Sequence, residues 1–351
     1  MDALGFLDIP EYKREVDLIA NALNVTNKTF FITGATGMIG SVIADVLIEG
    51  NINKKLNNTI IASGRNINKL KARFPFRDDR LVLLAYDVNN AIGSKLDIDY
   101  IIHTASNADP KSYATLPAET FLTNVIGTRN VLEYCKVHNK CRLLLMSTFE
   151  VYGKIEGKRI YTEDDVGLLN YNKLRACYPE SKRAMEVIAH CYKDEYGVDY
   201  VIGRLCSIYG PTMSPNDSKA HAQFIHKALA HEDIILKSKG EQVRSYCYVM
   251  DAVSALFKML FSGNSGECYN ISNENSITSI CDLAHLIAKE SKLDVDQELP
   301  TAQEAKGYSR PQDIVLDNNK LRSLGWSATY SLKEGISDTI AILVRIKIHN
   351  E

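Results

Sequence analysis

The sequence lacks three features that would each assign it to a particular class of protein. There is no basic excess, because the formal net charge is -2 at pH 7, and this argues against nucleic acid as a main partner. The eight cysteines include no Cys-x-x-Cys pair, so we predict neither a disulfide framework nor a metal site. No apolar run is long enough to cross a bilayer, and residues 1–5 lack a signal-peptide pattern. We therefore expect a cytoplasmic protein with reduced thiols and no membrane partner.

The composition is that of a globular protein with a large core. The chain has 351 residues, of which 45% are hydrophobic and 24% charged, so disorder or a fibre is not expected. This length favours two lobes.

A glycine-rich stretch organises the chain. The apolar run Phe30-Phe31-Ile32-Thr33 leads into Gly34, Gly37 and Gly40, spaced three apart, before an apolar-periodic segment resumes at Val42. We interpret this as strand, phosphate loop and helix, with the helix N-terminus facing an anion. The spacing differs from the common Gly-x-Gly-x-x-Gly fingerprint, so a glycine-rich turn without a ligand is the alternative.

Short apolar strands recur along the first two thirds of the chain. We expect strands near residues 59–63, 81–86, 100–106, 143–146 and 200–203, with helical patterns between them. Repeated units of this kind predict an α/β fold, a Rossmann-type doubly wound parallel sheet. An amphipathic helix over residues 10–24 precedes the first strand. We expect it to pack on the main domain, with a partner-binding arm as the alternative.

The loop over residues 210–217 is rich in glycine, proline and other turn-forming residues, and the repeated pattern of strands and helices ends there. We predict a dinucleotide-binding domain from residues 25–206 and 243–272, and a smaller discontinuous substrate lobe from residues 207–242 and 273–351. Residues 1–24 form a helical extension.

Tyr178 and Lys182 lie four residues apart at the start of a predicted helix, so both side chains point toward one volume. A tyrosine near its ordinary pKa of about 10 is a poor base at neutral pH. We expect the ammonium of Lys182 to lower the pKa of Tyr178 and make it a usable acid and base. By itself this spacing also occurs on surface helices.

Two further groups carry candidate chemistry. Thr148 and Glu150 follow an apolar strand, where open α/β sheets bind ligands, so Thr148 is placed to bind a substrate oxygen and Glu150 to act as a second acid or base. Arg244 and Arg310 are candidates for gripping phosphates. The alternatives are that Thr148 and Glu150 satisfy loop backbone groups and that the arginines form surface ion pairs.

The motifs together resemble the extended short-chain dehydrogenase/reductases of the NAD-dependent epimerase/dehydratase family, which modify nucleotide sugars. The resemblance runs from about residue 28 to Leu324-Gly325-Trp326. It is carried by the glycine loop, Ser147-Thr148-x-Glu150-Val151-Tyr152-Gly153, Tyr178/Lys182, Arg204 through Tyr209-Gly210-Pro211, and Arg244-Ser245-Tyr246-x-Tyr248-Val249-x-Asp251.

Within that superfamily the chain most resembles UDP-glucuronate decarboxylases. The carriers are Arg175-Ala176-Cys177-Tyr178-x-Glu180-x-Lys182-Arg183, Tyr209-Gly210-Pro211-x-Met213 with Asn216-Asp217, and Thr123-Asn124-x-Ile126-Gly127-Thr128. The epimerase and 4,6-dehydratase branches share the catalytic core.

Four positions depart from the decarboxylase pattern. Phe149 replaces a small hydroxyl residue, Ser207 replaces an asparagine, and Asp109 lies where it would repel a substrate carboxylate. The second strand ends in Ser63-Gly64-Arg65-Asn66 without the acidic residue that binds the ribose of NAD, so Arg65 would suit the 2′-phosphate of NADP.

The resemblance implies a site and a reaction. Thr148, Glu150, Tyr178 and Lys182 would be catalytic, and NAD, with NADP as an alternative, would be the cofactor. The implied cofactor-binding residues are Gly34, Thr36, Gly37, Met38, Ile39, Arg65, Asp87, Val88, Thr104, Ala105, Ser106, Asn124, Tyr178, Lys182 and Leu205. The implied substrate-binding residues are Asp109, Phe149, Ser207, Arg244 and Arg310.

In this family the sugar is oxidised at C4 and the hydride is returned after decarboxylation, elimination or rotation of the ketosugar. We expect a UDP-linked sugar as substrate and a homodimer formed through the helices near residues 118–138 and 179–196. An alternative from another class is a non-catalytic cofactor-binding sensor or scaffold, which the trio Thr148, Tyr178 and Lys182 argues against.

Overall fold

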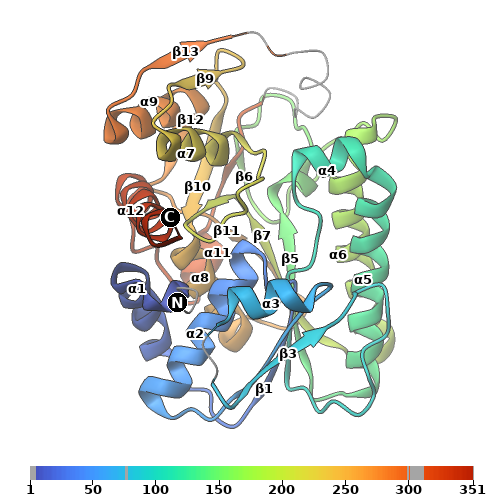
Figure 1. Cartoon of the computed structure of the whole chain (residues 1–351). Coiled ribbons are helices and arrows are strands. Elements are labelled where there is room, and N and C mark those ends of the chain that lie inside the picture. The colour runs from blue at the N-terminus through green and yellow to red at the C-terminus, as the bar shows by residue number, and fades with distance from the viewer. Residues whose placement is uncertain (1–4, 76–77, 299, 301–311, 351) are drawn as a thin grey trace.

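The computed structural model describes residues 5–75, 78–298, 300 and 312–350 (Figure 1). Its α-helices are α1 Pro10–Ala22, α2 Met38–Lys54, α3 Ile67–Arg73, α4 Pro110–Thr115, α5 Pro117–Val137, α6 Cys177–Tyr196, α7 Ala220–Ala230, α8 Val249–Ser262, α9 Ile280–Ser291, α11 Asn319–Ser323 and α12 Leu332–Asn350. Short 3-10 helices occur at η1 Phe6–Asp8, η2 Phe149–Tyr152 and η3 Leu174–Ala176.

A seven-stranded sheet forms the centre of the molecule. Its strand order is β11-β7-β5-β4-β1-β2-β3, and every neighbouring pair is parallel. This order confirms the predicted Rossmann-type sheet. The strands are β1 Thr29–Thr33, β2 Thr59–Gly64, β3 Leu81–Ala85, β4 Tyr100–His103, β5 Arg142–Thr148, β7 Asp199–Leu205 and β11 Cys268–Ile271.

Helices cover both faces of this sheet, so its strands are apolar on both sides. Phe30 and Ile32 of β1 belong to the core on the face covered by α2 and α8, whereas Phe31 between them belongs to the core on the face covered by α5 and α6. Figure 1 shows α5 and α6 side by side on one flank. The carboxyl ends of the strands therefore open between two packed layers.

A second region is built from smaller sheets. Strand β10 (Val243–Tyr248) pairs with β8 (Ser207–Tyr209) in parallel and with β12 (Ile277–Ser279) in antiparallel. The remaining short pairs are β13 (Val295–Gln297) with β9 (Ile234–Leu236) and β14 (Val315–Leu316) with β6 (Ile160–Tyr161). The prediction grouped residues 243–272 with the dinucleotide-binding domain. In the structure α8 and β11 pack there, but β10 pairs within the second region.

Some local expectations need correction. No helix separates β3 from β4, and residues 86–99 connect them through turns. Helix α6 begins at Cys177, so Tyr178 already lies in its first turn. Helix α2, which follows the glycine loop, runs from Met38 to Lys54 and ends on Lys55, which has a left-handed backbone.

Helix α1 packs on the main domain as expected. The Tyr12 hydroxyl donates to Asp45 of α2 at 2.5 Å, and Asp45 also pairs with Arg73 of α3. The Tyr248 hydroxyl of β10 donates to Glu15 at 2.7 Å. The helix therefore joins the Rossmann layer to the second region. None of the described helices has the length and apolar character needed to cross a membrane.

Candidate active site

The glycine loop has the geometry of a phosphate-binding turn. Gly34 has φ +68°, and a Cβ there would lie 2.9 Å from the Ala105 Cα. A Cβ on Gly40 would lie 2.7 Å from the Gly34 carbonyl oxygen. Gly37 caps α2, whose first residues are Met38 and Ile39, and Thr36 is exposed on the loop. The unpaired N–H groups of this helix end can receive a pyrophosphate, so the loop fits a dinucleotide.

The strand next to this loop contributes further predicted residues. Thr104 and Ala105 follow β4 and are hydrogen bonded to the last residue of β1. The Ser106 hydroxyl donates to the Asn124 amide oxygen at 2.7 Å, and the Asn124 amide nitrogen donates to the Ser181 hydroxyl at 2.8 Å. The structure thus connects the rim of the cofactor site to helix α6 through α5.

Arg65 lies at the end of β2, where the ribose of a dinucleotide would be recognised. Its guanidinium pairs with the Glu119 carboxylate of α5 at 3.1 Å, and both side chains are exposed. A cation already paired with a carboxylate offers less positive charge to a 2′-phosphate, which favours NAD over NADP. Asp87 and Val88 follow β3, and Leu205 ends β7, all at the carboxyl ends of their strands.

Tyr178, Lys182 and Thr148 come together as predicted. Both Tyr178 and Lys182 are buried on α6, and the Thr148 hydroxyl at the end of β5 hydrogen bonds to the Tyr178 phenol. The Lys182 ammonium donates to the Met146 carbonyl oxygen at 2.7 Å and lies 5.9 Å from the centre of the Tyr178 ring. The Thr148 hydroxyl therefore contacts the phenol, and the Lys182 ammonium lies near the phenol ring.

The pKa of Tyr178 is raised overall, so the expectation of a lowered value is wrong for this arrangement. Burial raises the pKa of Tyr178 above its ordinary value, and the nearby Glu150 charge adds to that rise. The Lys182 ammonium is directed at a backbone carbonyl and not at the phenol oxygen. Hydrogen bonds from Thr148 and Tyr113 act in the opposite direction and stabilise a phenolate.

Glu150 is held by a partner that the sequence analysis did not single out. Its carboxylate pairs with the Arg175 guanidinium at 2.8 Å, and both side chains are largely buried. The Arg175 guanidinium lies 4.4 Å from the ring centre of Tyr113, which stacks on the Tyr178 ring at 4.5 Å. The Arg175 Nε and Nη1 atoms have no hydrogen-bond partner in the described part of the chain.

Arg244 lies near the ring of Phe149, the residue before Glu150. Arg244 is buried, which lowers its pKa, and its guanidinium donates to the Gln312 carbonyl oxygen at 2.6 Å. It lies 5.7 Å from the centre of the half-buried Phe149 ring. No carboxylate of the described residues forms an ion pair with Arg244. Ser207 begins β8 beside Tyr246, on the same small sheet as Arg244.

Asp109, which was predicted to bind substrate, accepts hydrogen bonds from two segments of the chain. Asp109 caps α4 through a bond from the Ser112 amide at 3.1 Å, and its other oxygen accepts from the Ser218 amide at 3.1 Å. Burial opposes ionisation of Asp109, but these hydrogen bonds lower its pKa overall. This geometry favours a role in holding α4 to the loop before α7. Arg310 lies outside the described residues.

The comparisons identify the family to which this site belongs. Residues 30–272 match the model of the NAD dependent epimerase/dehydratase family. The chain belongs to that family. It is therefore an NAD-dependent enzyme on a Rossmann fold.

Curated relatives and solved structures agree with this assignment. UDP-glucuronic acid decarboxylase 6 of Arabidopsis thaliana is 32% identical, over 89% of this chain and 87% of its own length. UDP-glucuronic acid decarboxylase 1 of Danio rerio is 33% identical, over 91% of this chain and 73% of its own. A UDP-glucuronic acid 4-epimerase from Bacillus cereus, solved with UDP-glucuronic acid and NAD, is 23% identical with a TM-score of 0.76, covering 91% of this chain and 99% of that chain.

Sequence reasoning missed the parts of the site that loops bring together. Arg175 appeared only within a resemblance motif, and Tyr113 carried no sequence signal, because η3 and the short helix α4 position them. Their packing against Tyr178 is set by tertiary contacts. The position of Arg175 three residues before Tyr178 was the one available signal.

Proposed function

We propose that this enzyme binds NAD and a UDP-linked sugar, oxidises the sugar at C4, and reduces it again after a second step. NAD supplies the hydride acceptor and, once reduced, the hydride donor. Tyr178 takes the proton from the C4 hydroxyl while Thr148 and Tyr113 direct hydrogen bonds at the phenol oxygen. The positive charge of Lys182 stabilises the phenolate that the reaction needs.

For the second step we propose decarboxylation of UDP-glucuronate. A C4 ketone is β to the carboxylate on C5, so the C5–C6 bond can break with loss of CO2 while its electron pair moves to the ketone oxygen. Protonation at C5 and return of the hydride to C4 complete the cycle without net oxidation. Glu150 is placed to move the proton in this step because it lies beside Tyr178.

The observation that carries this choice is the positive charge at the sugar end of the site. Two buried or largely buried guanidiniums, Arg175 and Arg244, face one carboxylate, Glu150, and Arg175 has two unpartnered nitrogen atoms. Buried cations without full compensation are costly unless an anion joins them. A diphosphate together with a sugar carboxylate supplies such anions.

Phe149 supports a second candidate, a 4-epimerase or 4,6-dehydratase acting on a neutral sugar nucleotide. Its ring lies 5.7 Å from the Arg244 guanidinium and offers no hydrogen bond to a carboxylate. An apolar surface at this point suits a hydroxymethyl or methyl group at C5. The two candidates share C4 oxidation and differ only in the step that follows.

Product analysis separates them. The protein is incubated with NAD and UDP-glucuronate labelled with 13C at C6, and the headspace CO2 and the remaining nucleotide sugar are measured by mass spectrometry. Labelled CO2 and a UDP-pentose support decarboxylation. Absence of CO2, with conversion of UDP-glucose or a related neutral sugar in a parallel reaction, supports the second candidate and rules out the first.

We further propose a homodimer formed through α5 and α6. Phe121 and Leu122 of α5 and Val187 of α6 are exposed although the two helices pack against each other. A second copy would cover these apolar side chains. Light scattering at micromolar protein should give twice the chain mass, and Val187→Glu should return it to the monomer mass. A monomeric wild type would contradict the proposal.

A cytoplasmic location accompanies this proposal. All eight cysteines are free thiols, which supports a reducing compartment.

A further inference from the structure

The buried carboxylate Glu186 lies on the catalytic face of α6 and has no part in the mechanism above. Tyr178, Lys182 and Glu186 follow one another at intervals of four residues, so their side chains lie on one face of the helix. All three are buried. The face therefore presents a phenol, an ammonium and a carboxylate in order along the helix.

Three consecutive residues of β5 contact these three side chains. The Met146 carbonyl oxygen accepts from Lys182 at 2.7 Å, and the Ser147 hydroxyl donates to Glu186. The Thr148 hydroxyl bonds to Tyr178. Strand and helix are thus matched residue by residue, and Glu186 is one of the three points of contact.

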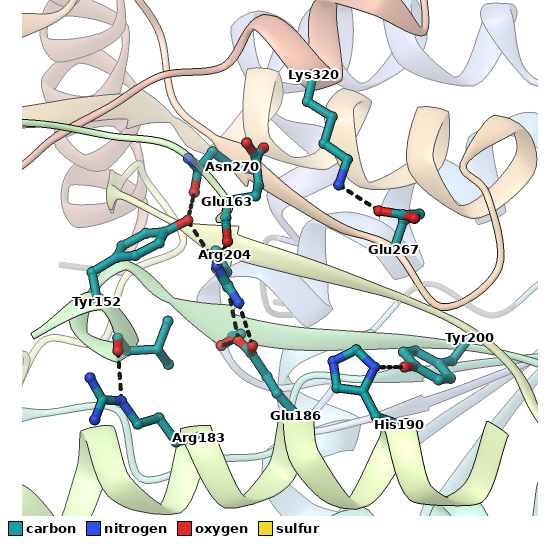
Figure 2. Close-up of polar contacts among 12 residues, drawn as sticks. Tyr152, Glu163, Arg183, Glu186, His190, Tyr200, Arg204, Glu267, Asn270 and Lys320 are labelled. Carbon is teal, nitrogen blue, oxygen red and sulfur yellow. Dashed lines mark hydrogen bonds and ion pairs between the residues drawn. The ribbon is translucent and has the colours of Figure 1, made fainter. Parts of the chain in front are cut away.

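Arg204 of β7 fixes Glu186 from the neighbouring strand. Its Nη2 lies 2.7 Å from the Glu186 Oε2, and its Nε lies 3.2 Å from Oε1 (Figure 2). The same guanidinium donates to the Tyr152 hydroxyl at 3.1 Å and to the Glu163 carbonyl oxygen at 2.7 Å. Tyr152 in turn donates to Asn270 of β11 at 2.6 Å. A bidentate pair with such support holds the carboxylate in one place.

The charges that act on Lys182 indicate the role of the Glu186 carboxylate. Burial lowers the pKa of Lys182 to about 8, and the Glu186 charge acts against that lowering. On β4, burial and the Lys182 charge lower the pKa of His103 to about 3, so His103 adds no charge near neutral pH. Tyr178 lies on the other side of the ammonium, and the sulfur of Met185 lies 3.9 Å away.

Other titratable groups face Glu186. Tyr200 of β7 and Cys268 of β11 have pKa values raised first by burial and further by nearby charges that include Glu186, so both stay neutral at working pH. Burial opposes the positive charge of Arg204, but its bonds to Glu186 raise its pKa overall. Among these groups, Glu186 is therefore the one whose negative charge acts on Lys182.

We propose that Glu186 is a positioning residue that keeps Lys182 in its ammonium form beneath Tyr178, with Arg204 anchoring the carboxylate. This inference rests on the proposed role of Tyr178 and Lys182 in C4 oxidation. It adds a requirement to that role, because a lysine buried without a counter-charge would lose its proton near neutral pH and no longer stabilise a phenolate.

The direct test measures the ionisation of Lys182 without any substrate. Lysine is labelled with 13C at Cε, the Lys182 resonance is assigned with Lys182→Arg, and its titration is followed by NMR in the NAD-loaded protein. Glu186→Gln should move the midpoint down by about one pH unit or more. Ser147→Ala, which removes a hydrogen bond but keeps the carboxylate, should change it by less than about 0.3 unit.

A second variant covers the case in which Glu186→Gln fails to fold because Arg204 is left unpaired. The double variant Glu186→Gln/Arg204→Met removes both buried charges, and the midpoint should still fall, because Glu186 and not Arg204 acts on the pKa of Lys182. An unchanged midpoint in a folded variant overturns the inference. This readout does not depend on which sugar is the substrate, so a wild type inactive on every sugar would sink the proposed function alone.

Turnover gives the matching kinetic readout. With the substrate found for the wild type, kcat of Glu186→Gln should fall roughly tenfold at pH 8 and less than about threefold at pH 6.5, with the alkaline limb moved to lower pH. Glu186→Asp should recover part of the loss. A loss that is equal at every pH would indicate a merely structural role and contradict the inference.

Discussion

The two sides of the Tyr178 phenol are built in different ways. On the cofactor side, Lys182, Glu186 and Thr148 are positioned by one helix and one strand of the sheet. On the sugar side, Glu150 and Arg175 come from the short 3-10 helices η2 and η3 and are held by their mutual ion pair. Regular elements fix geometry through backbone hydrogen bonds, whereas the sugar side depends on side-chain pairs.

The two steps of the proposed reaction make different demands on these two sides. C4 oxidation needs one fixed arrangement of phenol, ammonium and hydroxyl, which a helix packed on a strand provides. The second step depends on groups around C5, and loop residues such as Phe149 and Arg175 can change without disturbing the sheet. Substitutions on the two sides should therefore have different consequences.

The largest expected effect is on the cofactor side. Tyr178→Phe keeps the ring stacked on Tyr113 but removes the oxygen that we propose takes the C4 proton. Steady-state turnover should fall by at least about 10³-fold, because no other group within reach can replace the base. Affinity for NAD and for UDP, measured by calorimetry, should change by less than about threefold. Turnover above a tenth of wild type would show that another group is the base.

Glu150→Gln should leave oxidation at C4 possible but slow the second step of the reaction. We expect turnover to fall by about 10²-fold while substrate still reduces bound NAD, so that reduced nicotinamide and a ketosugar accumulate. Stopped-flow absorbance and mass spectrometry of quenched samples measure both. Glu180→Gln on α6, which changes a half-exposed carboxylate 3.9 Å from Arg183, is the matched control and should behave as wild type. A loss of activity that only follows a loss of stability would assign Glu150 a structural role.

Phe149→Ser tests the sugar side and should change the rate less than the two preceding variants. If the enzyme is a decarboxylase, a hydroxyl beside Glu150 and Arg244 should assist the carboxylate and raise the rate of CO2 release by roughly threefold to tenfold. Phe149→Leu provides the control, because it reduces ring packing without adding a donor. Equal rates for the two variants would show that a hydrogen bond at this position does not limit decarboxylation.

The smallest effect concerns stability. Lys182 is buried with its pKa lowered to about 8, so near pH 7 its charge costs folding free energy. Lys182→Met should raise the free energy of unfolding at pH 7 by about 1–2 kcal/mol while abolishing turnover. Above pH 8 the folded wild type loses this proton before the unfolded chain does, so wild-type stability rises and the gain shrinks.

Urea denaturation between pH 7 and pH 10 measures that trend. Lys193→Met, on the same helix but at a surface position, is the matched control. If Lys182→Met still raised the free energy of unfolding by the same amount at pH 10, the gain would come from better packing and not from removal of a buried charge.

The elements on the cofactor side could be predicted from the sequence because their signals are local. Glycine spacing, apolar runs and the four-residue interval from Tyr178 to Lys182 describe single elements, and the fold brought Thr148 to Tyr178 as expected. The sugar side was less predictable. Asp109 was expected near a substrate carboxylate, yet bonds from Ser112 and Ser218 occupy it. The rise in the Tyr178 pKa depends on burial depth and on Glu150, which no spacing reveals.

The attachment of helix α1 has a consequence for the order in which the protein folds. The partner of Glu15, Tyr248, lies 233 positions further along the chain, and the partner of Glu11, Arg345 of α12, lies 334 positions further. On the ribosome, α1 emerges first but can complete its packing only after most of the chain has been synthesised. Until then, α1 is held by contacts with nearby parts of the chain, such as the Tyr12–Asp45 hydrogen bond to α2. The contacts of α1 with Tyr248 and Arg345 are thus among the last long-range contacts to form, and their presence indicates that the whole chain has folded.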